Sequence, residues 1–217
     1  MKKNISIYSF LLFLIPAITL FICYLIHVYY YDLKSIPFID GEVSVSLVGR
    51  QEKTIIIFRS GLLLYALVSI LFYFKVSNFL LSINTKNKFK GMAIFANFFL
   101  CVYLFALGKQ EPFFEVSRRI SIILFITTMY INHIYLLKML RNLNFKRKIE
   151  LKKNHILALY LILIIITILV IIGLPWVNPL FKYPDKLKNI VEWNLLFLVI
   201  IYYIPISHYF YKSKDLT

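Results

Sequence analysis

Acidic residues are scarce in this chain of 217 residues, which carries ten Asp and Glu against 25 Lys and Arg. Charged residues of both signs make up only 16% of the chain, whereas soluble domains average about a quarter. A soluble protein with so little charge would expose large apolar patches to water and aggregate. The composition therefore excludes an ordinary soluble fold and indicates that lipid is the solvent.

Cysteine is rare as well. Cys23 and Cys101 both lie inside apolar segments, so the sequence has neither a disulfide framework nor a CxxC metal site. The signatures of zinc proteases, serine hydrolases and phosphate-binding loops are also missing from the sequence. We therefore predict no metal and no cofactor, and the sequence leaves open whether the protein is an enzyme.

Apolar residues make up 60% of the chain, and they gather in six runs. A helix needs about 20 mostly apolar residues to cross a bilayer. We predict an all-α membrane helix bundle of about six spans that forms a single domain over residues 1–217. The predicted spans are Ile5–Tyr31, Thr54–Val76, Met92–Leu107, Ile120–Leu140, Ile156–Leu174 and Val191–Tyr211. Pro16 and Pro205 are expected to kink the first and the last of them.

The basic residues are divided unevenly between the two sides of this bundle. The termini and the second and fourth loops hold 15 of the 25 cations and two of the ten acids, a net charge of +13 against +2 on the opposite side. Because cytoplasmic loops are enriched in Lys and Arg, we predict that both termini are cytoplasmic. The basic loop Lys138–Lys153 fits this role and also contact with anionic lipid. Trp193, at the start of the sixth span, is expected to be an interfacial anchor.

The connection Ser35–Arg59, which this orientation places outside, is the most unusual segment between spans, because it mixes acids, cations and serines. Asp40-Gly41 predicts a turn, and the alternation of apolar and polar residues from Val43 to Val48 predicts a short extended segment. Arg59 falls just inside the second span, where a cation must reach outward or pair with an acid.

Two interpretations of this outer face stay open: a closed network of ion pairs, or a polar pocket for a lipid headgroup. Arginine suits the second, because its planar fork binds phosphate through two hydrogen bonds. The candidate ligand-binding residues are Asp40, Glu42, Ser44, Ser46, Arg50, Arg59, Arg118 and Arg119.

The same connection carries a resemblance to a known family. The order Pro37-Phe38-Ile39, then Ser44 to Arg50, then Ile57-Phe58-Arg59-Ser60-Gly61-Leu62 resembles the DRAM/Frag/Sfk family of six-span membrane proteins. The family's histidine at the start of the fourth span has no counterpart near Ser117–Ser121, nor does a Pro-rich stretch follow Arg50. Eukaryotic members are linked to autophagy, lipid asymmetry and remodelling of GPI-anchor lipids. The resemblance implies lipid-related work at a membrane.

These observations predict a multi-pass protein of the plasma (cytoplasmic) membrane that binds or organises lipids, anionic lipids included, and does not bind nucleic acid. One alternative is a lipid-modifying enzyme that uses polar residues of the outer loop together with His27. Another is a small-solute transporter, whose cavity would be lined by Asn97, His133 and Asn194. The sequence predicts no particular oligomeric state.

Overall fold

The computed structural model describes residues 2–32, 36–145, 153–173 and 183–212, and every regular element within these ranges is a helix. Residue 174, the last of the predicted fifth span, and residues 146–152 of the predicted basic loop lie outside the described ranges. The elements are α1 (Lys2–Tyr31), α2 (Pro37–Asp40), α3 (Val45–Arg50), α4 (Ile55–Ser82), α5 (Phe89–Ala106), α6 (Pro112–Phe145), α7 (Lys153–Ile172), α8 (Pro184–Ile201) and α9 (Tyr203–Lys212).

Six long apolar helices confirm the predicted all-α, six-span bundle. Helices α1, α4, α5, α6 and α7, together with the pair α8 and α9, are long and apolar enough to cross a membrane. Helix α6 has 34 residues and is therefore about 50 Å long, against a hydrocarbon core of about 30 Å. Helix α6 is thus long enough for both of its ends to reach the level of the lipid headgroups.

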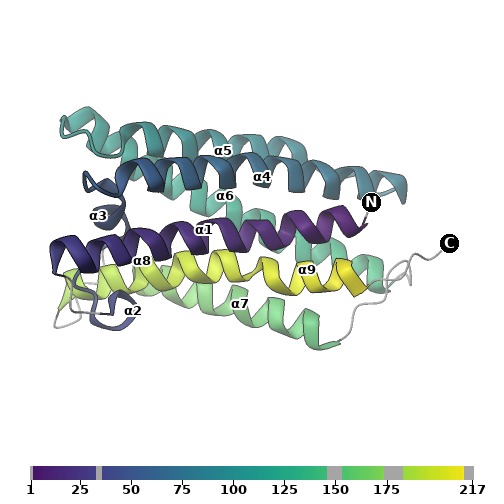
Figure 1. Cartoon of the computed structure of the whole chain (residues 1–217). Coiled ribbons are helices and arrows are strands. Elements are labelled where there is room, and N and C mark those ends of the chain that lie inside the picture. The colour runs from purple at the N-terminus through teal and green to yellow at the C-terminus, as the bar shows by residue number, and fades with distance from the viewer. Residues whose placement is uncertain (1, 33–35, 146–152, 174–182, 213–217) are drawn as a thin grey trace.

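The helices run side by side, and the two chain termini lie at the same end of the bundle (Figure 1). An even number of spans requires this arrangement. The short helices α2 and α3 lie at the opposite end, which we call the outer end (Figure 1). The assignment of the termini to the cytoplasm stays a prediction from the charge distribution.

Pro205 divides the last span into two helices. Helix α8 ends at Ile201 and α9 begins at Tyr203. In a continuous helix the ring of Pro205 would clash with the carbonyl four residues earlier, which is that of Ile201. The interruption falls at the residue Tyr202, close to the proline predicted to kink this span. Helix α1, in contrast, continues through Pro16 from Lys2 to Tyr31.

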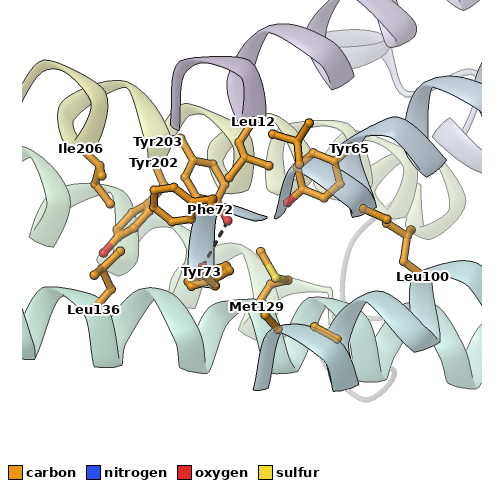
Figure 2. Close-up of a cluster of buried hydrophobic side chains, with 14 of the residues drawn as sticks. Leu12, Tyr65, Phe72, Tyr73, Leu100, Met129, Leu136, Tyr202, Tyr203 and Ile206 are labelled. Carbon is orange, nitrogen blue, oxygen red and sulfur yellow. Dashed lines mark hydrogen bonds between the residues drawn. The ribbon is translucent and has the colours of Figure 1, made fainter. Parts of the chain in front are cut away.

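Buried aromatic side chains fill the centre of the bundle (Figure 2). Tyr73, Tyr202 and Tyr203 are fully buried, and the hydroxyls of Tyr73 and Tyr203 share a hydrogen bond of 3.2 Å. Phe72 meets the Tyr203 ring edge-on, with ring centroids 5.5 Å apart. The hydrogen bond and the ring contacts join α4 to α9 across the core, and both helices pack against α1.

The short extended segment predicted for Val43–Val48 is wrong, because Val45–Arg50 forms helix α3. Ser44 caps this helix, since its Oγ accepts a hydrogen bond from the Leu47 N–H at 3.0 Å. Val45 and Val48, three residues apart, are both buried on one helical face. A helix satisfies its own backbone groups, whereas a lone extended segment would need a partner strand.

Candidate functional site at the outer end

Three side chains of α8 hold the outer loop against the bundle. Asn189 Nδ2 donates to the Gly41 carbonyl at 2.8 Å, Trp193 Nε1 to the Val43 carbonyl at 2.9 Å, and Asn194 Nδ2 to a third loop carbonyl, that of Phe38, at 2.9 Å. We call these three residues the α8 clasp. Buried backbone carbonyls need such donors when no regular element supplies them. The clasp therefore fixes where α2 and α3 lie.

Glu192 of α8 contacts the outer loop, and the sequence reasoning did not single it out. Its Oε1 accepts a hydrogen bond from the Ser46 N–H at 3.2 Å, so the carboxylate lies at the start of α3. Its position within an apolar run, directly before Trp193, is the sequence signal that could have identified it.

The structure separates six of the eight predicted ligand-binding residues into two groups, and the first group belongs to the loop that the clasp holds. Asp40 accepts the Ile36 N–H at 2.7 Å, and Glu42 lies 3.8 Å from Lys186 of α8. The hydroxyls of Ser44 and Ser46 lie 3.2 Å apart. These four polar residues stabilise the fold of the loop.

The second group lines a pocket of about 450 Å³ at the outer end. Arg50 at the end of α3 and Arg118 in the second turn of α6 both face it, although 68 positions of the chain separate them. We call it the outer pocket. Its lining residues are Leu47, Arg50, Gln51, Gly108, Lys109, Gln110, Glu115 and Arg118.

Positive charge predominates in the outer pocket, because three of its lining residues are cations and one is an acid. Glu115 also forms an ion pair with Arg119, one helical turn further along α6, so its charge is already compensated outside the pocket. The Lys109 ammonium lies 3.7 Å from the ring centroid of Phe105 and 4.1 Å from that of Phe114. These cation–π contacts hold a flexible side chain at the pocket wall.

Arg59 stabilises the pocket wall from behind. Its guanidinium donates to the carbonyl of Leu107, the residue before Gly108. Gly108 has a φ of +84°, and a Cβ added there would lie 2.6 Å from the Ile55 side chain. The sequence left open whether Arg59 reaches outward or pairs with an acid, and in the described structure its guanidinium anchors the α5–α6 turn through a backbone carbonyl. It is therefore a positioning residue next to the pocket.

The polar residues considered for the alternative functions lie in separate contacts. His27 stacks on Tyr31 with centroids 4.8 Å apart, and Asn97 Nδ2 donates to Ser69 Oγ at 3.1 Å. His133 is fully buried and stacks on the Tyr202 ring at 4.0 Å. Asn194 belongs to the α8 clasp. In the described structure these four side chains therefore make four separate contacts and do not form one shared site.

Comparisons with protein-family models, with curated proteins and with solved structures found no match. The molecule has six helices of membrane-spanning length and composition and, at one end, a pocket with net positive charge. The chain is a multi-pass integral membrane protein.

Proposed function

We propose that the protein binds or organises membrane lipids, and that the outer pocket holds a phosphate-bearing headgroup. The observation that carries this proposal is the convergence of Arg50, Lys109 and Arg118 on one pocket. Two guanidinium groups and an ammonium group offer many N–H donors to the oxygens of a phosphate. Glu115, the one acid among the described residues that line the pocket, is paired with Arg119.

The position and size of the pocket support a lipid as the ligand. The pocket includes the second turn of α6, which extends beyond the hydrocarbon core to the headgroup level. Its volume of about 450 Å³ falls in the usual range of small-molecule sites, about 300 to 1,000 Å³. The resemblance of residues 37–62 to the DRAM/Frag/Sfk family agrees with lipid-related work. The proposal places the protein in the plasma (cytoplasmic) membrane with the pocket outside.

The test compares lipid retention by wild type and by the double variant Arg50→Gln/Arg118→Gln. The purified protein is taken from nanodiscs of phosphatidylcholine and phosphatidylglycerol, and bound lipid is counted by native mass spectrometry. A hydrogen bond to a charged group contributes about 1.5–3 kcal/mol, so each lost arginine weakens retention about 10- to 150-fold. Inorganic phosphate is then added to separate two ligands. If the pocket binds a lipid headgroup, the lipid stays bound, whereas if it binds free phosphate, the added phosphate displaces the lipid.

Lys53→Gln is the matched control, because Lys53 is an exposed cation of the same outer end whose ammonium faces Tyr30 at 5.7 Å. We expect this variant to retain lipid as wild type does. Equal retention by all three proteins would contradict the proposal.

A further inference from the structure

A second recess lies between α6 and α7, far along the bundle from the outer pocket. It has a volume of about 580 Å³ and is shaped by one face of each helix. We call it the lateral groove. Its lining residues are Tyr130, Ile134, Leu137, Lys138, Arg141, Asn142, Tyr160, Leu163, Ile164 and Thr167.

The lateral groove changes character along its length. Ile134, Leu137, Leu163 and Ile164 make its wall apolar, whereas Lys138, Arg141 and Asn142 gather at the end that α6 reaches last. That end is the one at which both chain termini lie (Figure 1). The described lining residues include cations and no acid, so the polar end of the groove is electropositive.

The length of the groove matches one leaflet of a bilayer. Tyr130 and Arg141 are 11 residues apart on α6, which corresponds to about 16 Å of helix. Half of the hydrocarbon core is about 15 Å. Arg141 therefore lies at the headgroup level when Tyr130 lies near the middle of the membrane.

Hydrogen bonds between the two helices define both ends of the groove. The Tyr130 hydroxyl and Thr167 Oγ1 are 2.5 Å apart at the deep end. At the basic end, Arg141 Nη1 donates to the Tyr160 hydroxyl at 3.1 Å. That bond uses one of the five N–H donors of a guanidinium and holds the group in place for a second, anionic acceptor.

We propose that the lateral groove binds an anionic phospholipid of the cytoplasmic leaflet. One acyl chain lies along the apolar wall, and the phosphate meets Lys138 and Arg141. Charge complementarity selects this occupant: a wholly apolar partner would leave the cations without a counter-charge, whereas an anionic lipid supplies both chain and charge. Helix α7 supports a lipid contact, because only 17% of its apolar window is buried inside the protein.

This site differs from the proposed headgroup pocket in its lining residues and its leaflet, so each can fail without the other. The first test measures retention of phosphatidylglycerol relative to phosphatidylcholine by native mass spectrometry from nanodiscs. For Lys138→Gln/Arg141→Gln we expect the preference for phosphatidylglycerol to fall about 30-fold, because this variant removes two cations that attract anionic lipid at the membrane surface. Lys86→Gln/Lys88→Gln removes the same charge from an exposed loop at the same end and should keep the preference. Equal preference in both double variants would overturn the proposal.

The second test fills the groove while its charge is left intact. Ile164 lines the groove, and its neighbour Ile165 is 44% exposed and is not among the lining residues. A photoactivatable phosphatidylglycerol with its reactive group in the acyl chain should cross-link to residues 130–141 in wild type and in Ile165→Trp, and lose this cross-link in Ile164→Trp. Unchanged cross-linking in Ile164→Trp would overturn the proposal. A dimer that Ile164→Trp dissociates would also overturn it, because a second copy of the chain would then occupy the groove.

Discussion

The indole of Trp193 gives the sharpest test of how the outer end is built. The side chain is only 2% exposed, and its Nε1 donates to the Val43 carbonyl at 2.9 Å. Trp193→Phe keeps an aromatic ring beside Phe38, whose centroid lies 5.3 Å from that of Trp193, but removes the donor. Water cannot easily replace the donor at so buried a position, so the carbonyl is left without a partner.

The expected cost follows from the energy of an unsatisfied buried group, about 1–3 kcal/mol. For a chain of this length each kcal/mol lowers Tm by about 2–4 °C, so a loss of about 2 kcal/mol corresponds to about 4–8 °C. Thermal unfolding in detergent, followed by circular dichroism at the helix band, measures the shift. Hydrogen exchange should also quicken over residues 36–50, since the α8 clasp is weakened.

Tyr29→Phe is the control, because Tyr29 is 81% exposed and lies outside the clasp. It should leave both Tm and exchange unchanged. If Trp193→Phe behaves like this control in both assays, the bond to Val43 does not hold the loop, and Trp193 is an ordinary interfacial anchor.

Three further predictions concern backbone space and orientation. Gly41→Ala should lower Tm by several degrees, because φ is +63° and the new Cβ would lie 2.1 Å from a backbone carbonyl oxygen of α8. Gly91→Ala should raise Tm slightly, since nothing lies within 4 Å of its Cβ position in α5 and alanine favours helices by up to about 1 kcal/mol; a loss of stability would contradict the reasoning. The orientation is tested by labelling in a chain that carries Cys101→Ser. The exposed Gln110→Cys should react with a membrane-impermeant maleimide in intact cells, whereas Lys86→Cys should react only after permeabilisation. The reverse result would show that the predicted topology is inverted.

The spans could be predicted from the sequence because hydropathy is a property of each segment by itself. A run such as Ile156–Ile172 needs no partner to be recognised as membrane-spanning. The interruption near Pro205 is equally local, since a proline lacks the N–H that would bond within its own helix. The helical state of Val45–Arg50 was missed because its valines fit an alternating pattern over a few residues. The cap at Ser44 and the contact of α3 with α8 decided the outcome.

The outer pocket could be predicted only in part, because it is assembled from distant segments. Arg50 and Arg118 were recognisable as cations at the same membrane level, and the structure brings both to one pocket. Lys109 was not selected, since its position depends on the aromatic rings of Phe105 and Phe114. Arg59 was expected to reach outward or to pair with an acid, whereas the turn before Gly108 supplies a backbone carbonyl. Such partners depend on helix packing, which hydropathy does not encode.

A structure of the protein crystallised from a lipid mesophase containing phosphatidylglycerol tests the central claim most directly. We predict electron density for a phosphate in the outer pocket, within hydrogen-bonding distance of the guanidinium groups of Arg50 and Arg118, and continuous with an acyl chain beside the bundle. An outer pocket without lipid density, in which Arg118 has turned to pair with Glu115, would contradict the claim.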